Sequence, residues 1–206
     1  MKKVKIILIT LIAIGGAILI YHHFDKSPVD ENKTKKQKNE YTLITGKNLL
    51  ETKSIDEVTN IINNKTGVVF LCNPKSDWCQ YYAYLLNDAA IERGIDKIYY
   101  ANIADERNMN SNKYQKLVTA LEDYLYTDDT NSKRIYMPNM TVVKDGKILA
   151  NNNETSIMLN NISAKDYWNE SNQFNFKEKL SNYINLLNKI EVPEESEEEE
   201  WYIGNT

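Results

Sequence analysis

The chain has 206 residues, of which 42% are hydrophobic and 26% are charged, and its formal net charge at pH 7 is −4. This length allows one domain of ordinary size with extensions at its ends, and the hydrophobic content is sufficient for a core. The negative charge balance argues against nucleic acid as the main partner.

The N-terminus carries an apolar segment long enough to cross a membrane. Residues 6–21 contain no charged side chain, and two histidines, if neutral, extend the run to Phe24. A run of this length spans a bilayer core of about 30 Å when it is slightly compressed or flanked by snorkelling lysines. We therefore predict a transmembrane signal-anchor at 1–24, with residues 4–24 in the membrane. A signal peptide cleaved at residues 13–15 is the alternative, disfavoured because the apolar run continues past that point.

Lysines flank this segment on both sides. Lys2, Lys3 and Lys5 precede it, which favours a cytoplasmic N-terminus, whereas four more lysines follow within residues 33–38. The residues directly after the span carry little positive charge. We therefore predict a single-pass protein of the cell membrane whose soluble part lies outside the cytoplasm.

A polar, charged segment without hydrophobic periodicity follows at residues 25–40 and predicts a flexible linker. The pattern becomes globular at residue 41. Residues 41–45 predict a short strand, and residues 54–63 predict a helix whose Ser54 and Glu57 form a capping box. The continuous apolar run at 68–72 is typical of a strand in the middle of a sheet.

Helix and strand signals alternate through the rest of the domain, which we place at residues 41–190. Gly94 ends one predicted helix, and Asp145-Gly146 is a strong hairpin turn between two strands. The Asn-rich residues 151–173 predict a long irregular loop. The predicted elements are a helix at 79–93, a strand at 97–103, a helix at 114–126, strands at 140–143 and 148–150, and an amphipathic helix at 176–190.

The resulting order of strands and helices predicts an α/β domain, a mixed sheet with helices on both faces. A tail at 191–206 follows, with seven glutamates between residues 191 and 200. Such a run predicts a solvated, disordered segment. The alternative is a docking segment, supported by the apolar residues 201–203 beside the acid.

The most informative chemistry lies where the strand at 68–72 turns into the next helix. Cys79 falls in the first turn of that helix, where unsatisfied N–H groups and the positive end of the helix dipole favour a thiolate. Thiol–disulfide exchange normally needs a second thiol, and neither Cys72 nor Cys79 has a partner at C-x-x-C spacing. Two registers place the chain on that motif: Ser76 to Cys79, or Cys79 to Tyr82.

Several spaced blocks resemble the thioredoxin superfamily, and in particular bacterial thioredoxin-like proteins described as bacteriocin transport accessory proteins. The resemblance covers about residues 41–190. In that group Cys-x-Trp-Cys precedes the helix, so Trp78 and Cys79 match its second half and Ser76 occupies the position of the attacking cysteine. This favours the first register and implies an oxidoreductase-like site that has lost one sulfur. The blocks are residues 78–90, 98–100, 114–117, 123–126, 135–138 and 143–147.

The same resemblance implies that Pro138 follows a cis peptide bond and faces the cysteine turn. The main chain of Met137 would then pair with an extended peptide, and Tyr82 is a further candidate to line a peptide groove. The alternative for Pro138 is a proline that merely begins a strand.

A structural interpretation of the cysteine turn remains open beside the chemical one. Ser76 is a good helix N-cap, Asp77 suits the helix dipole, and Cys79 can be a small buried hydrophobic residue. A Cys72–Cys79 disulfide could close a short loop, as a structural staple rather than a catalytic couple. We expect no metal site and no cofactor, because the two histidines lie at the membrane boundary.

Three functions follow as expectations, one of them a purely structural membrane protein for which the geometry at Pro138 would be incidental. The first is a membrane-anchored extracytoplasmic thioredoxin-like protein with a degenerate S-x-x-C site, which handles thiols or disulfides of exported peptides or proteins. The alternative is a redox-inactive peptide-binding or accessory protein, chaperone-like, for export or bacteriocin-type systems. The missing thiol leaves enzyme activity undecided at this stage.

Overall fold

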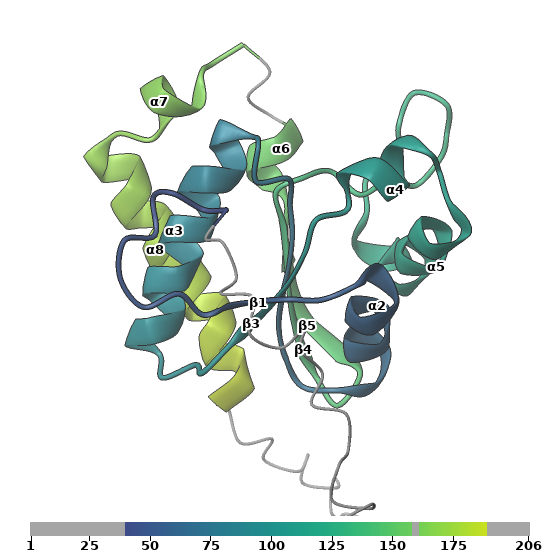
Figure 1. Ribbon diagram of the computed structural model, residues 1–206, viewed down its shortest axis with the longest axis horizontal. Helices are drawn as coiled ribbons and strands as arrows, with labels where there is room; N and C mark the ends of the chain where they lie inside the picture. Colours follow the sequence, from purple (N-terminus) through teal and green to yellow (C-terminus); the bar gives the residue numbers. More distant parts are fainter. Residues whose placement is uncertain (1–39, 158–160, 189–206) are drawn as a thin grey trace, which may run out of the picture. The chain divides into compact units, whose positions relative to one another are not determined.

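A five-stranded mixed sheet organises residues 40–157 and 161–188, the part of the chain that the computed structural model describes (Figure 1). The strand order is β1-β3-β2-β4-β5, with β1, β2 and β3 parallel to one another and β4 antiparallel to both β2 and β5. The predicted α/β class with a mixed sheet is therefore confirmed. The strands are β1 (Leu50–Thr52), β2 (Gly67–Leu71), β3 (Ile98–Ala101), β4 (Asn139–Lys144) and β5 (Lys147–Asn152).

Helices cover both faces of this sheet, as predicted. In Figure 1, α3 and α8 lie against one face, while α2 and α5 lie against the other. The α-helices are α2 (Ile55–Asn64), α3 (Asp77–Glu92), α4 (Ala104–Asn108), α5 (Asn112–Ala120), α6 (Glu154–Ile157), α7 (Ala164–Tyr167) and α8 (Glu170–Ile184). Two 3₁₀ helices, η2 (Glu122–Tyr124) and η3 (Asn185–Asn188), follow α5 and α8.

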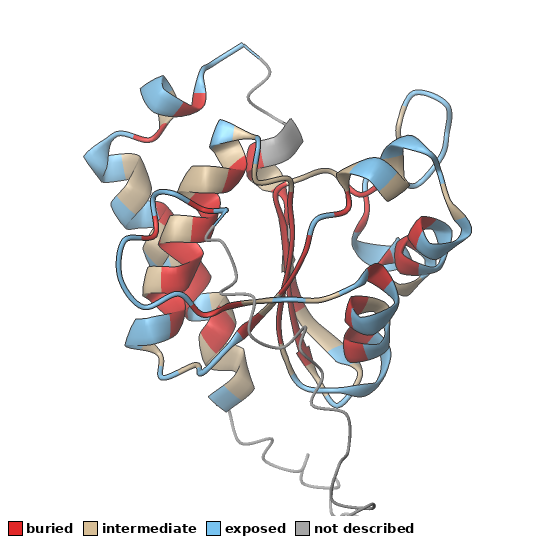
Figure 2. Ribbon diagram, in the orientation of Figure 1, coloured by how far each residue is buried: buried red, intermediate tan, exposed pale blue. Residues whose placement is uncertain are grey.

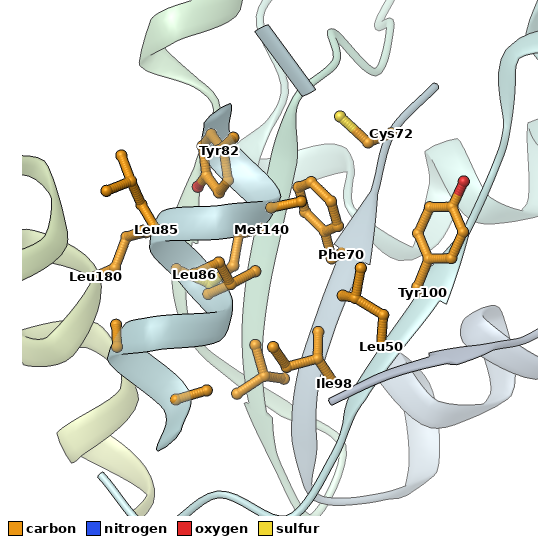
Figure 3. Packing of buried hydrophobic residues seen from close by; sticks show 14 of the residues in the cluster. Leu50, Phe70, Cys72, Tyr82, Leu85, Leu86, Ile98, Tyr100, Met140 and Leu180 are labelled. Carbon is orange, nitrogen blue, oxygen red and sulfur yellow. The ribbon is translucent and has the colours of Figure 1, made fainter. Parts of the chain in front are cut away.

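The central strand β2 explains the continuous apolar run in the sequence. Val68 and Phe70 belong to the core beneath α3 and α8, whereas Val69 and Leu71 belong to the core beneath α2 and α5. Because both sides of the strand are buried, every position needs an apolar side chain. Figure 2 shows the sheet buried while the outer faces of the helices are exposed. Figure 3 shows Phe70 and Tyr82 meeting between α3 and the sheet.

Two local sequence signals form as predicted. Ser54 and Glu57 make a reciprocal capping box at the start of α2, with Ser54 N–H donating to Glu57 Oε2 at 2.8 Å and Glu57 N–H donating to Ser54 Oγ at 3.3 Å. These hydrogen bonds from Ser54 lower the pKa of Glu57. Asp145 and Gly146, both with positive φ, form the turn between β4 and β5. A Cβ at position 146 would collide with the carbonyl of Asn63, so glycine is required there.

The predicted strand at 41–45 is wrong, because these residues form a turn at 42–43 and are otherwise irregular, and β1 is the first strand of the described residues. Residues 40–49, here called the arm, instead cross α3 and attach to two of its amide side chains. Thr42 N–H donates to Gln80 Oε1 at 2.8 Å, and Leu49 N–H donates to Asn87 Oδ1 at 2.9 Å. Since side chains satisfy these backbone groups, the arm needs no strand neighbour.

The predicted loop at 151–173 is also wrong, because it contains the end of β5, α6, α7 and the first turn of α8. Ser163 accepts from Asp166 N–H to begin α7, and Asn169 accepts from Asn172 N–H to begin α8 at Glu170 rather than at residue 176. The helix predicted at 114–126 divides into α5 and η2, and α4 was not predicted.

The predicted signal-anchor at 1–24, most of the linker at 25–40 and the tail at 191–206 lie outside the described residues. Among residues 40–157 and 161–188, no helix combines the length and apolar character needed to cross a bilayer.

Candidate functional site

The sheet register brings the two segments singled out in the sequence to the same end of the sheet. Leu71, the last residue of β2, pairs with Asn139, the first residue of the antiparallel β4. Cys72 therefore leaves the sheet where Pro138 enters it, and α3 begins at Asp77 just beyond the turn. We call residues 72–80 and 135–138 the two halves of the candidate site.

Cys72 and Cys79 are joined by a disulfide, with their Cα atoms 5.9 Å apart. The staple considered from the sequence is thus the arrangement found. Both residues have an exposed fraction of 0% and belong to the core beneath α3 (Figure 3 labels Cys72). The N–H of Asn73 donates to Cys79 Sγ at 3.3 Å. The sulfur atoms are therefore bonded, hydrogen-bonded and out of contact with solvent.

Ser76, which the resemblance would place at the position of an attacking cysteine, is the N-cap of α3. Its carbonyl accepts from Gln80 N–H at 3.0 Å, but its side chain makes no capping hydrogen bond. The N-cap prediction is therefore right in position, while the expected hydroxyl contact is absent. Asp77 follows in the first turn and is exposed, as suits a carboxylate at a positive helix end.

Gln80 is a residue of the site that the sequence reasoning missed. Its Nε2 donates to the carbonyl of Pro74 at 2.6 Å and to that of Glu40 at 2.9 Å, while its Oε1 accepts from Thr42 N–H. One amide thus joins the turn after β2 to the start of the arm. No sequence signal marked it, because a glutamine in the first turns of a helix is ordinary.

Trp78 is half-buried and contacts α7 and the residue that follows it. Its ring centroid lies 5.3 Å from that of Tyr167 and 6.2 Å from that of Trp168. Trp168 in turn contacts Phe176 of α8 at 5.1 Å. The predicted site residue Trp78 therefore forms part of an aromatic cluster that covers the start of α3.

Tyr82 does not line a groove, contrary to the interpretation of it as a peptide-binding residue. It is fully buried, stacks on Phe70 with ring centroids 5.3 Å apart, and donates its hydroxyl to Asn152 Oδ1 at 2.9 Å. This burial raises the pKa of Tyr82 well above its usual value. Its position on the inner face of α3 turns it toward the sheet and makes it a core residue.

The Met137–Pro138 peptide bond is cis, as the resemblance implied. Pro138 is buried, and Met137 is half-buried and packs against the cores on both faces of the sheet. Among the described residues, the N–H and C=O groups of Met137 take part in no hydrogen bond. This main chain is the open part of the site.

Two side chains hold the segment that leads into Met137. Arg107 Nε donates to the carbonyl of Ile135 at 2.9 Å, and the N–H of Ile135 donates to the hydroxyl of Tyr114 at 3.0 Å. The Arg107 guanidinium also lies 5.9 Å from the centre of the Tyr136 ring. Both main-chain groups of Ile135 are therefore hydrogen-bonded to side chains, two residues before Met137.

No family model matches this chain, and the search of curated proteins found no match. Within residues 40–157 and 161–188, no three His, Cys, Asp or Glu residues lie close enough together to hold a metal ion.

Proposed function

We propose that this chain is a membrane-anchored, thioredoxin-like protein that binds extended segments of exported peptides or proteins outside the cytoplasm, without dithiol exchange. The thioredoxin-like part is supported by the spaced sequence blocks and by the order of helices and strands. The anchor and the location are supported by the apolar segment at 4–24 and the lysines before it. The binding role is carried by one observation: the main chain of Met137 makes no hydrogen bond within the part of the chain that the structure describes.

An extended peptide gains affinity by pairing its main chain with unpaired N–H and C=O groups of a protein, while side-chain pockets supply specificity. Met137 offers both of its main-chain groups and is only half-buried. The side chains of Arg107 and Tyr114 hold the main chain of Ile135, and Arg107 also lies over the ring of Tyr136. The segment before Met137 is therefore already fixed, so little ordering is needed on binding.

The same geometry disfavours exchange. A disulfide is opened by a thiolate that reaches one of its sulfur atoms in line. Both Cys72 and Cys79 are inaccessible to solvent, and the position at the helix end that could carry an exposed thiol holds Ser76. A serine hydroxyl is a far weaker acid than a thiol and forms no mixed disulfide.

Thiol handling is the second candidate, favoured by one contact. The N–H of Asn73 donates to Cys79 Sγ, and Cys79 itself lies in the first turn of α3. Both this N–H and the positive end of the helix would stabilise a thiolate there once the disulfide opened. An insulin-disulfide reduction assay separates the two functions. Activity in the wild type that is lost in Cys79→Ala supports the second, whereas a wild type at background level, with activity appearing in Ser76→Cys, supports the first.

Amide hydrogen exchange on the full chain tests the binding role directly. With a carboxymethylated, permanently unfolded protein as client, we expect slower exchange at Tyr136 and Met137. Met137→Asp should weaken client binding, because it places a charge beside the paired segment. Ile91→Asp, an equivalent change on an exposed residue at the far end of α3, should leave binding unchanged. Client binding without protection at Met137 would overturn the proposal.

A further inference from the structure

A polar groove of about 610 Å³ lies between α4, α5 and the loop that precedes Ile135. Three cations line it: Arg107 of α4, and Lys133 and Arg134 of the loop. The whole chain contains three arginines, and two of them are here. We call this cavity the arginine groove.

Neither guanidinium is paired with a carboxylate in the part of the chain that the structure describes, where all the ion pairs are made by lysines. Arg107 uses Nε to bind the carbonyl of Ile135, which leaves its terminal nitrogens available. Arg134 is half-buried, and its side chain makes no hydrogen bond to any other described residue. Two oriented guanidinium groups beside one cavity favour carboxylate or phosphate oxygens.

Two carboxylates also line the groove, those of Asp128 and Glu122, and Arg134 lies close enough to Asp128 to help lower the pKa of that carboxyl. Asp128 Oδ1 accepts from the hydroxyl and N–H of Thr130 at 2.6 and 2.9 Å and from Ser132 N–H at 3.0 Å, so it is engaged within its own loop. Glu122 is exposed. Lys133 donates one hydrogen bond, to the carbonyl of Leu125 at 2.9 Å, and adds a third positive charge beside the two arginines.

Arg107 and Arg134 connect the arginine groove with residues 135–138, because both line the groove and Arg134 directly precedes Ile135 in the chain. Arg107 contacts Ile135 and Tyr136, the two residues directly before Met137. A peptide paired in extended form with Met137 would therefore carry its flanking side chains toward the groove.

We propose that the arginine groove binds carboxylate side chains that flank the client segment held at Met137, so that the clients are acidic peptides. This inference rests on the proposed function and adds the class of client to it. A hydrogen bond to a charged group contributes about 1.5–3 kcal/mol, which corresponds to about tenfold or more in affinity.

Fluorescence anisotropy on the full chain in neutral detergent tests the proposal with two labelled peptides. Both contain the same Val/Thr core, flanked in one by glutamates and in the other by glutamines. At low salt we expect the glutamate peptide to bind about tenfold more tightly, and Arg134→Gln to remove most of that preference. Lys147→Gln, which removes an exposed cation of β5, should leave the preference intact.

Because Arg107 also holds Ile135, Arg107→Lys is a second variant that keeps the charge but loses the forked geometry; it should reduce the preference less than Arg134→Gln does. Equal affinity for the two peptides would overturn the acidic preference and leave the proposed function standing. A preference that survives Arg134→Gln would place the carboxylate contact elsewhere and also overturn it. Failure of both peptides to bind would contradict the proposed function itself.

Discussion

The two halves of the site, at the same end of the sheet, differ in what they leave open. In residues 72–80 the sulfur atoms are bonded to each other, and Gln80 hydrogen-bonds to Pro74, Thr42 and Glu40. In residues 135–138 the main chain of Met137 makes no hydrogen bond to any other described residue. The first half therefore contributes stability, whereas the second is the half that we propose to bind a client.

The largest effect on stability should come from high pH, because three tyrosines are buried in the core beneath α3, which also contains Cys72 and Cys79. Burial raises the pKa of Tyr41 and of Tyr82, and raises the pKa of Tyr100 to about 12. The unfolded value is about 10, so the contribution of the three tyrosines to stability is complete below that pH and begins to fall above it. The contribution of Tyr100 is lost as the pH rises through about 12, and those of Tyr41 and Tyr82 at still higher pH. Tyrosinate absorbance and circular dichroism should therefore change together. Full ionisation of these tyrosines with retained ellipticity would contradict the assignment.

Removing the disulfide should separate stability from binding. The bond links residues 7 positions apart, and opening so short a loop costs about 2.5 kcal/mol in the free energy of unfolding. We expect this loss in Cys72→Ala/Cys79→Ala by urea denaturation, with client affinity unchanged. A variant that keeps its stability but loses client binding would reverse the roles assigned to the two halves.

The arm offers a matched pair of amides on α3. Asn87 is 2% exposed and binds both Leu49 N–H and the carbonyl of Lys47. Asn87→Ala leaves those groups unsatisfied and should cost about 2 kcal/mol, whereas Gln80→Ala, nearer to solvent, should cost about 1 kcal/mol. Urea denaturation measures both changes. Proteolysis within residues 40–49 should become faster in each variant, and an arm that stays resistant in Asn87→Ala would contradict this attachment.

The smallest effect distinguishes two serines at helix starts. Ser54→Ala removes a capping box and should cost about 1 kcal/mol. Ser76→Ala removes no hydrogen bond and should stay within about 0.5 kcal/mol of the wild type. Thermal unfolding of the two variants side by side measures the difference. Equal losses would mean that Ser76 caps α3 after all.

The sequence predicted the fold well where the structure of an element is determined by residues that are close together in the chain. The buried run of β2, the capping box of α2 and the turn at Asp145-Gly146 each follow from neighbouring residues. The arm was mistaken for a strand because its partners are side chains of α3, more than thirty residues away. Asparagines suggested a loop at 151–173, although Ser163 and Asn169 there begin helices.

The sequence predicted which residues lie in the candidate site, but not whether the cysteines are bonded or which way the side chains point. Spacing and resemblance placed Ser76, Cys79 and Pro138 together, and the register of β2 with β4 brings their segments to one end of the sheet. Whether Cys72 reaches Cys79 depends on the path of the turn between them, which no pattern encodes. The inward orientation of Tyr82 depends on how α3 rotates against the sheet. The arginine groove was missed because Arg107 and Arg134 meet only through the fold.

The attachment of the arm has a mechanical consequence. Its first described residue, Glu40, is bound by the same Gln80 amide that holds the Pro74 carbonyl. A pull applied to the chain at residue 40 would load this amide first, then Asn87 two turns further along α3, and only afterwards β1. Tension from the N-terminal side would therefore reach the turn of the candidate site before any strand of the sheet, and the Cys72–Cys79 bond would keep that turn from extending.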